Sequence, residues 1–320
     1  MKAAIVFPGQ GSQGPAMGAP WADQPAWELV DRASEVLGRD LAPLMTGQDT
    51  PANALDVQLS VFLASMLSWE GLRPALDEPP VFAGHSFGQL GALTAAGVLS
   101  FEDGLLLAAR RGEVTTAACA ARPGGMLGVV GLPIAKAAWV CSAAPAQCWL
   151  ANDNAPGQFV VSGAAEALEP VTARARQLGA RKVIPLRVPG AFHTPFMLPA
   201  ATEFGAYLST LRFMTSSGLV LSNADARVVT VPRAWASHLA DNLITPVRWR
   251  AIQLEIARLG LTDLVEVGFG TTLTSLAKRT VPALRRWNVD GPAAIRELTM
   301  ATGTGWRQAE LVGALPGDEA

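Results

Sequence analysis

The chain has 320 residues, of which 50% are apolar and 16% are charged, and its formal net charge is −2. This composition excludes a disordered chain, and the length suits one large domain with an insertion or two modest domains. The absence of a basic run argues against a nucleic-acid-binding protein. No run of about 18 apolar residues occurs, so we expect no membrane span.

The cysteines and the N-terminus bear on the compartment. The first apolar run breaks at Pro8, which is too early for a secretory signal peptide. Cys119, Cys141 and Cys148 have no metal-ligand spacing, so we expect no metal site. Reduced, buried thiols in a cytoplasmic protein are the favoured interpretation, and pairing of Cys141 with Cys148 would need an oxidising compartment.

The first third of the chain alternates expected strands and helices. Residues 3–7 and 81–83 read as buried strands, and the second strand runs straight into Gly84-His-Ser-Phe-Gly88. Helical spacing covers residues 24–38, 52–74 and 88–98, and Ser100-Phe-Glu-Asp103 resembles a capping box that opens a further helix. Such alternation predicts a mostly parallel sheet.

A different order follows between residues 124 and 190. The segments 126–131, 133–143, 148–151, 159–162, 165–178 and 182–188 read as strand, helix, strand, strand, helix and strand. This βαββαβ order is that of a ferredoxin-like unit. The later expected elements are helices at 196–212, 233–243, 248–258 and 272–280, with strands at 219–221 and 264–267.

We therefore predict an α/β fold with two parts. The large part, residues 1–123 and 191–320, is an α/β-hydrolase-like domain with a mostly parallel sheet. The small part, residues 124–190, is an inserted ferredoxin-like subdomain.

Ser86 is the first candidate for chemistry. Gly84-His-Ser-Phe-Gly88 fits the Gly-x-Ser-x-Gly pattern of a nucleophile elbow, between an apolar strand and a small-residue helix. Small residues are needed on both sides because a side chain there would clash in the sharp turn. The turn also leaves the Phe87 N–H free at a helix N-terminus, where it can stabilise an oxyanion. A structural Gly-rich turn is the alternative.

A serine nucleophile needs a base, and the chain has three histidines. His85 lies beside the serine on the tight turn and is interpreted as a packing or hydrogen-bonding residue. His238 lies within an expected helix and is interpreted as a surface or hydrogen-bonded histidine. His193 precedes Thr194-Pro195 in a loop that leads into a helix, where catalytic groups commonly lie. By elimination, His193 is the best base.

These motifs occur in a set that resembles the malonyl-CoA:acyl carrier protein transacylases and the related acyltransferase domains of fatty-acid and polyketide synthases. The resemblance runs over nearly the full length in the same chain order. Its anchors are Phe7-Pro-Gly-Gln-Gly-Ser-Gln13, Gly84-His-Ser-Phe-Gly88, Arg111-Gly112, Asn152-Asp-Asn154, Pro156-Gly-Gln158, Ala191-Phe-His193, Pro246-Val-Arg-Trp249 and Glu266-Val-Gly268.

The resemblance implies a role for each matching position. Ser86 would be the nucleophile and His193 the general base, oriented by a backbone carbonyl at Asn242 in place of a carboxylate. The Gln10 N–H would be the second oxyanion donor, beside that of Phe87. No metal or redox cofactor is implied, since coenzyme A and phosphopantetheine thioesters are the substrates. The expected partners are an acyl carrier protein and an acyl-CoA, and a monomer is expected.

Arg111 stands at the position of the arginine that grips the substrate carboxylate. A guanidinium binds a malonyl carboxylate through two parallel hydrogen bonds and stays charged at neutral pH. Arg110 would lie about 100° around the same helix and is expected to face solvent or a partner. An ordinary exposed helix arginine is the alternative for Arg111.

Other matching positions concern the acyl pocket and its surroundings. Phe192 would fill the space that a branched acyl group needs, and Asn152 and Asn154 could line the pocket or simply serve turn chemistry. The chain departs from the family with Gln89, where its members usually have Glu, and with Phe269, where they often have Pro. Four basic residues are candidates for docking an acidic carrier protein: Arg248, Arg250, Lys278 and Arg279.

Malonyl transfer from coenzyme A to a carrier protein is the leading hypothesis. A transferase that moves a larger acyl or aminoacyl chain between two carrier proteins is the main alternative, favoured by the two departures and opposed by Arg111. A thioesterase shares the elbow, but it would place its histidine last, after an acid. A carrier-docking scaffold and a malonate decarboxylase transacylase subunit also stay open.

Overall fold

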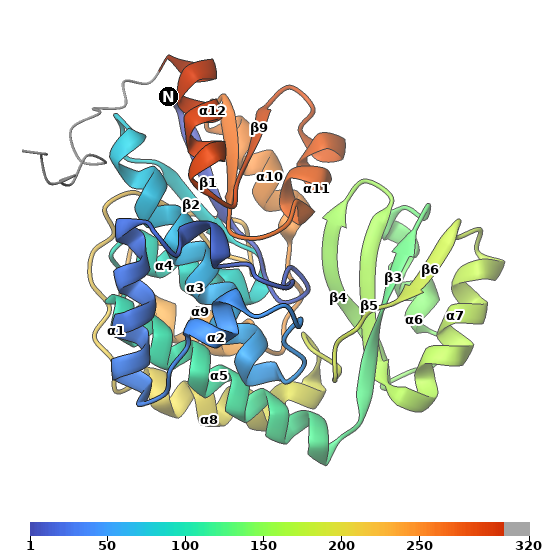
Figure 1. Cartoon of the computed structure of the whole chain (residues 1–320). Coiled ribbons are helices and arrows are strands. Elements are labelled where there is room, and N and C mark those ends of the chain that lie inside the picture. The colour runs from blue at the N-terminus through green and yellow to red at the C-terminus, as the bar shows by residue number, and fades with distance from the viewer. Residues whose placement is uncertain (304–320) are drawn as a thin grey trace, which may run out of the picture.

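The computed structural model describes residues 1–303, which form two subdomains, each built around one sheet (Figure 1). The large subdomain holds five parallel strands in the order β7-β2-β1-β8-β9. These strands are β1 (Ala3–Phe7), β2 (Val81–Gly84), β7 (Leu219–Leu221), β8 (Asp263–Val267) and β9 (Arg285–Val289). The prediction of a mostly parallel sheet is confirmed.

Helices cover both faces of this sheet, because its strands bury side chains on both sides. Ile5 and Phe7 face a core shared with α1 (Glu28–Leu37), α2 (Ala42–Thr46), α3 (Ala54–Leu72), α4 (Gln89–Ala95), α5 (Phe101–Ala121), α8 (Leu198–Leu208), α9 (Ala234–Asp241) and α12 (Pro292–Thr302). Ala4 and Val6 point the other way, into a core shared with α10 (Trp249–Arg258) and α11 (Thr272–Thr280). The buried β1 is thus the centre of the subdomain.

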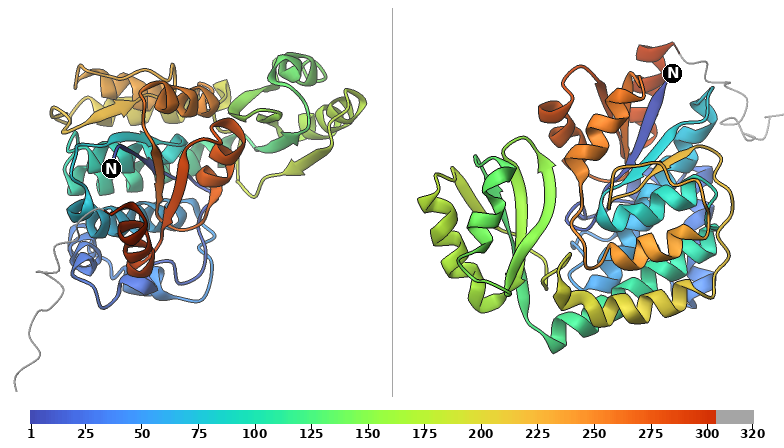
Figure 2. Two further views of the ribbon diagram at one scale, coloured as in Figure 1. Left: turned by 90° about the horizontal axis from the view of Figure 1, so that it is seen from above. Right: turned by 180° about the vertical axis from the view of Figure 1, so that it is seen from behind.

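The small subdomain lies to one side of the large one (Figure 2). Its elements are β3 (Gly124–Val130), α6 (Ala137–Cys141), β4 (Cys148–Ala155), β5 (Gln158–Ala164), α7 (Leu168–Gln177) and β6 (Lys182–Pro185). The sheet is antiparallel with the order β4-β5-β3-β6, and side chains of α6 and α7 pack on it in a separate core. Element order and strand order together are those of the predicted ferredoxin-like unit.

Local sequence signals explain where several elements begin. The Asn53 side chain accepts the Asp56 N–H at 2.8 Å and caps α3, and the Ser100 hydroxyl accepts the Asp103 N–H at 3.0 Å and caps α5. The second cap is the one that the sequence indicates. Among the α-helices and β-strands of residues 1–303, α2, β9 and α12 were not predicted.

No helix among residues 1–303 is both long enough and apolar enough to cross a membrane. The three cysteines are free thiols, and the sulfur atoms of Cys141 and Cys148 lie 3.8 Å apart.

Candidate active site

Ser86 sits on a sharp turn at the carboxyl end of β2, with φ at +53°. The flanking glycines make this turn possible. A Cβ at Gly84 would lie 2.1 Å from the Gly88 carbonyl carbon, and a Cβ at Gly88 would lie 2.1 Å from the Phe7 oxygen. The turn therefore presses against both its own strand and the end of β1, and only glycine fits at either position.

The Ser86 hydroxyl meets the His193 ring, with 2.7 Å between Oγ and Nε2. On the other side of the ring, Nδ1 lies 2.6 Å from the Asn242 carbonyl oxygen and 3.1 Å from that of Thr245. Because carbonyl oxygens only accept, Nδ1 carries the proton and Nε2 is left to accept from the serine. The pair is a Ser–His dyad in which backbone carbonyls orient the base.

The environment of His193 favours its neutral form. The ring is buried, and loss of solvation together with the positive charge of Arg111 lowers the pKa of His193 to about 3, despite the opposing effect of the two carbonyl groups. A neutral imidazole is the form that can take a proton from a hydroxyl. The histidine is therefore ready to act as a base at neutral pH.

Two backbone N–H groups near Ser86 are available as donors. None of the hydrogen bonds formed among residues 1–303 uses the N–H of Gln10 or that of Phe87. The Gln10 loop is held against the elbow, since a Cβ at Gly9 would lie 2.5 Å from the His85 oxygen. Free amides that flank a nucleophile are suited to stabilising an oxyanion.

Arg111 is buried beside this dyad and has no carboxylate partner among residues 1–303. Its guanidinium donates to the Gln58 side-chain oxygen at 3.1 Å and lies 5.5 Å from the ring centre of Phe87, the residue after the nucleophile. Burial lowers the pKa of Arg111 to about 10, so it stays charged at neutral pH. A buried, unneutralised cation in this position can bind an anionic group.

Arg110 has a different environment. It forms ion pairs with Glu113 at 2.9 Å and Glu203 at 2.5 Å at the surface of the helix. Arg110 therefore lies at the surface, whereas the neighbouring Arg111 is buried at the site.

The Acyl transferase domain model matches residues 4–314, which is nearly the whole chain. The chain belongs to this family. Malonyl CoA-acyl carrier protein transacylase of Synechocystis sp. is 34% identical over 291 residues, covering 90% of this chain and 97% of that protein. This chain is an acyltransferase.

Solved structures show the same likeness. An acyl carrier protein S-malonyltransferase from Vibrio cholerae has a TM-score of 0.88 and 34% identity, covering 93% of this chain and all of that one (100%). A malonyl-transacylase solved in complex with its type II polyketide synthase acyl-carrier protein has a TM-score of 0.89 and 31% identity, with coverages of 95% and 100%.

The other residues that the sequence assigns to the acyl pocket have different environments. Phe192 is buried in the large core. The Asn154 carboxamide oxygen lies 2.9 Å from His85 Nε2, so these two side chains satisfy each other. The buried Asn152 pairs through its backbone with Val247.

The four predicted docking residues divide into two groups. Arg250 forms an ion pair with Asp153 at 2.9 Å, and Arg279 donates to the Pro156 oxygen at 2.5 Å and to the Gln158 side chain at 2.6 Å. Arg248 and Lys278 are exposed, and their side chains make no ion pair or hydrogen bond with residues 1–303. Two of the four charges are therefore already engaged within the chain.

Sequence reasoning missed three residues of the acyltransferase site. Gln58, which contacts Arg111, lies in a uniformly buried stretch of α3, where only its polarity among apolar neighbours marks it. Thr245 contributes a backbone carbonyl, for which residue type gives no signal. Asn223 hydrogen-bonds the Ser86 N–H at 2.8 Å, although its sequence context reads as a turn.

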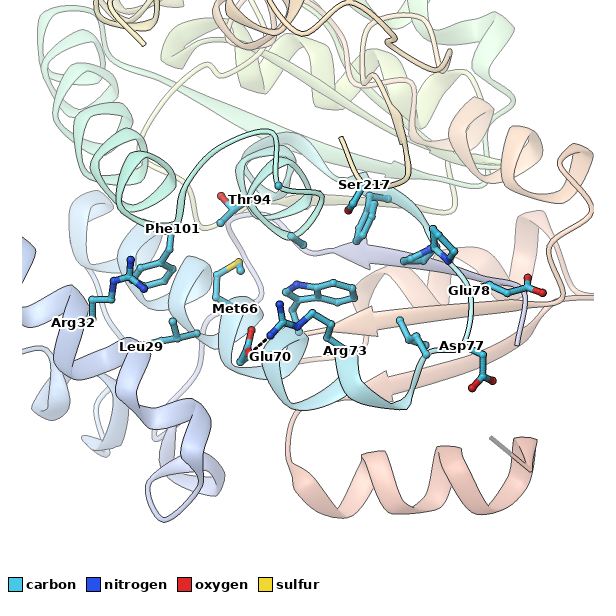
Figure 3. A pocket seen from close by; sticks show the side chains of 17 residues that line it. Leu29, Arg32, Met66, Glu70, Arg73, Asp77, Glu78, Thr94, Phe101 and Ser217 are labelled. Atoms are coloured by element: carbon cyan, nitrogen blue, oxygen red, sulfur yellow. Dashed lines mark hydrogen bonds and ion pairs between the residues drawn. The ribbon is translucent and has the colours of Figure 1, made fainter. Parts of the chain in front are cut away.

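A separate open cavity of about 640 Å³ lies at the opposite end of β2, where Pro79 and Pro80 precede the strand. Figure 3 shows the ion pair between Glu70 and Arg73 at this cavity. Since Ser86 follows the other end of β2, this cavity is not part of the acyltransferase site. Within residues 1–303, no cluster of three or more His, Cys, Asp or Glu side chains is placed to hold a metal ion.

Proposed function

We propose that this acyltransferase moves a malonyl group from coenzyme A to the phosphopantetheine thiol of an acyl carrier protein. The observation that carries this proposal is Arg111, a buried and unpaired cation on the ring of the residue that follows the nucleophile. The relatives that carry a malonyl-transferring name support the same substrate. The proposal places the malonyl carboxylate on Arg111 and its thioester carbonyl at Ser86.

The first half-reaction forms an acyl-enzyme. His193 Nε2 takes the Ser86 proton as Oγ attacks the thioester carbonyl carbon, and the Gln10 and Phe87 amides stabilise the oxyanion. The carbon–sulfur bond then breaks, and the coenzyme A thiolate leaves with the proton that His193 returns. A malonyl ester on Ser86 remains.

The second half-reaction reverses these roles. The carrier thiol gives its proton to His193 and attacks the ester, and Ser86 regains its proton as its bond to the acyl group breaks. Every proton and acyl group is handled by chain residues and the two thiols, so the proposed cycle uses no metal or redox cofactor. We place the enzyme in the cytoplasm, where its three free thiols would stay reduced.

The test is the mass of the intact protein after exposure to a panel of thioesters. Malonyl-CoA should add one malonyl group to the wild type and none to Ser86→Ala. Arg111→Ala should slow malonyl loading at least about 30-fold, since truncating one partner of a buried charge pair costs about 2–5 kcal/mol. Arg110→Ala is the matched control and should load as the wild type does.

The competing hypotheses give different results in the same assay. An adduct from a larger acyl carrier thioester, without a malonyl adduct, would support transfer of a bulkier chain. Rapid loss of the malonyl ester to water without an acceptor thiol would indicate a thioesterase. Equal malonyl loading of the Arg110 and Arg111 variants would contradict the carboxylate role of Arg111.

A further inference from the structure

Asn223 lies close to the nucleophile in space although the two are distant in sequence. It follows β7, which pairs in parallel with β2, and Ser86 follows β2. The carboxyl ends of neighbouring parallel strands meet at one edge of a sheet, so Asn223 and Ser86 come together there. The Asn223 side chain is buried.

The Asn223 carboxamide contacts the elbow on both sides of Ser86. Its Oδ1 accepts the Ser86 N–H at 2.8 Å. Its Nδ2 donates to the Gly84 carbonyl oxygen at 2.6 Å and also to the Gln89 side-chain oxygen at the start of α4. One side chain therefore joins the end of β2, the nucleophile and the following helix.

These partners allow only one orientation of the carboxamide. A flipped amide would set an NH₂ group against the Ser86 N–H donor and an oxygen against the Gly84 carbonyl oxygen, which can only accept. The Asn223 backbone is fixed as well, since its carbonyl accepts the Arg248 N–H at 3.0 Å. The side chain is thus held rigidly from outside the turn.

Ser86 needs such support because its φ of +53° is unusual for a residue with a side chain. Backbone in this region persists where surrounding contacts determine it. The hydrogen bond from Ser86 N–H to Asn223 also leaves the Phe87 N–H as the free amide of the elbow. Asn223 therefore bears on both the direction of Oγ and the choice of oxyanion donor.

We propose that Asn223 is a positioning residue of the acyl transfer reaction, which holds the Ser86 peptide so that Oγ meets His193 and the Phe87 N–H faces the oxyanion. This inference rests on the proposed function of Ser86 as the nucleophile. Asn223 touches the peptide of the nucleophile and not the reacting atoms, so its effect is on the rate of attack rather than on substrate affinity.

Two variants of Asn223 and one control separate positioning from simple stability. Asn223→Ala removes the acceptor and the donor. Asn223→Asp keeps the acceptor for Ser86 N–H but places a second oxygen against the Gly84 carbonyl oxygen. Ser222→Ala is the control, because Ser222 is a buried neighbour whose hydroxyl bonds to His238 and the Ala224 N–H, away from the elbow.

Two reactions of Ser86 are measured by intact mass, namely loading by malonyl-CoA and labelling by a fluorophosphonate. In the second, the Oγ–P bond forms, the P–F bond breaks, fluoride leaves and the serine proton passes to His193. Asn223→Ala should slow both about 100-fold with little change in KM for malonyl-CoA, as expected for a misplaced nucleophile. Ser222→Ala also loses buried hydrogen bonds but should keep both rates, because none of them is made to the elbow.

The pH dependence of Asn223→Asp gives a second readout. A protonated aspartic acid can accept from Ser86 N–H and donate to the Gly84 oxygen, as asparagine does. Its rate relative to the wild type should therefore recover as the pH falls from about 8 to about 5, where burial favours protonation, whereas Asn223→Ala should show no recovery. If Asn223→Ala does not fold, the pH dependence of Asn223→Asp relative to the wild type decides alone.

Wild-type rates in Asn223→Ala for both reactions would overturn the inference, as would a constant ratio of Asn223→Asp to wild type across the pH range. The two proposals fail separately. Wild-type Ser86 that reacts with the fluorophosphonate but not with malonyl-CoA contradicts malonyl transfer, and the Asn223 comparison can still be made with the fluorophosphonate.

Discussion

At the scale of single residues, burial keeps the His193 imidazole of the dyad neutral. His193 has lost most of its solvent, lies near the positive Arg111 and is oriented by carbonyl groups, with a pKa lowered to about 3 from 6.5. In many serine enzymes a carboxylate stabilises the charged imidazolium; here backbone dipoles take that place. The resting enzyme thus keeps the imidazole in its basic form over a wide pH range.

We predict that the rate of Ser86 acylation by malonyl-CoA at low substrate, which reports kcat/KM, stays nearly constant from about pH 7 to about pH 5. The neutral base is required, and its pKa in the free enzyme, about 3, lies below this window. Quenched-flow measurement of the acyl-enzyme provides the check. A loss of rate centred near pH 6.5 would show that His193 titrates as an ordinary histidine.

The pH dependence of protein stability provides an independent check on the lowered pKa of His193. Because the folded pKa is lowered, the unfolded chain binds the proton first, and the free energy of unfolding falls as the pH drops from 6.5 toward about 3. His193→Gln removes that contribution. Chemical denaturation should therefore show a shallower acid loss of stability for this variant than for the wild type.

Functional residues could be predicted from the sequence where their neighbours along the chain form a recognisable motif or loop. Ser86 stands within a five-residue motif, and His193 could be chosen among three histidines by its loop position. Asn223 and Gln58 could not be found this way. Their partners, Ser86 and Arg111, are distant in the chain, and only the pairing of β7 with β2 and the packing of α3 on α5 bring them near.

At the scale of elements, α4 can lie close to β1 because it has small residues at the contact. A Cβ at Gly91 would lie 2.8 Å from Phe7 Cδ1, whereas a Cβ at Gly205 in α8 would meet no atom nearer than 3.5 Å, the Cβ of Ala240. Both glycines lie within helices, so the same substitution has a steric cost at one position and none at the other.

We predict opposite effects of Gly91→Ala and Gly205→Ala on the free energy of unfolding. Alanine in a helix gains about 0.5–1 kcal/mol over glycine, which Gly205→Ala should show. At position 91, overpacking against Phe7 costs about 1–3 kcal/mol and outweighs that gain. Denaturant titration of the two variants tests the pair, and a Gly91→Ala variant as stable as Gly205→Ala would contradict close packing of α4 on β1.

Most elements of the fold followed from apolar periodicity, but β9 did not. Its sequence, Arg-Arg-Trp-Asn-Val, is largely polar, and the strand lies at the edge of the sheet with only Val289 buried. An edge strand needs no continuous apolar run, so periodicity gives little signal there. The buried central strands β1 and β2, by contrast, stand out as short apolar runs.

At the scale of the whole molecule, the edge strand β4 joins the two subdomains. The Val247 N–H donates to the Ala151 oxygen at 2.9 Å, and the Asp153 N–H donates to the Val247 oxygen at 2.9 Å. The same segment carries the Thr245 carbonyl that contacts His193. The ion pair of Arg250 with Asp153 adds to this junction, so the placement of the small subdomain and the orientation of the base are linked through one loop.

The basic residues near this junction differ in their partners. Arg250 and Arg279 bond within the chain, whereas the exposed side chains of Arg248 and Lys278 make no ion pair or hydrogen bond with residues 1–303. We predict that Arg248→Gln with Lys278→Gln raises the KM for an acyl carrier protein by up to about five-fold per charge and weakens its salt dependence, since exposed pairs contribute about 0.2–1 kcal/mol. Malonyl-CoA loading and the melting temperature should not change, because both side chains lie exposed without internal partners among residues 1–303. Arg250→Gln should instead lower the melting temperature by breaking its pair with Asp153. An unchanged carrier KM in the double variant would place the docking surface elsewhere.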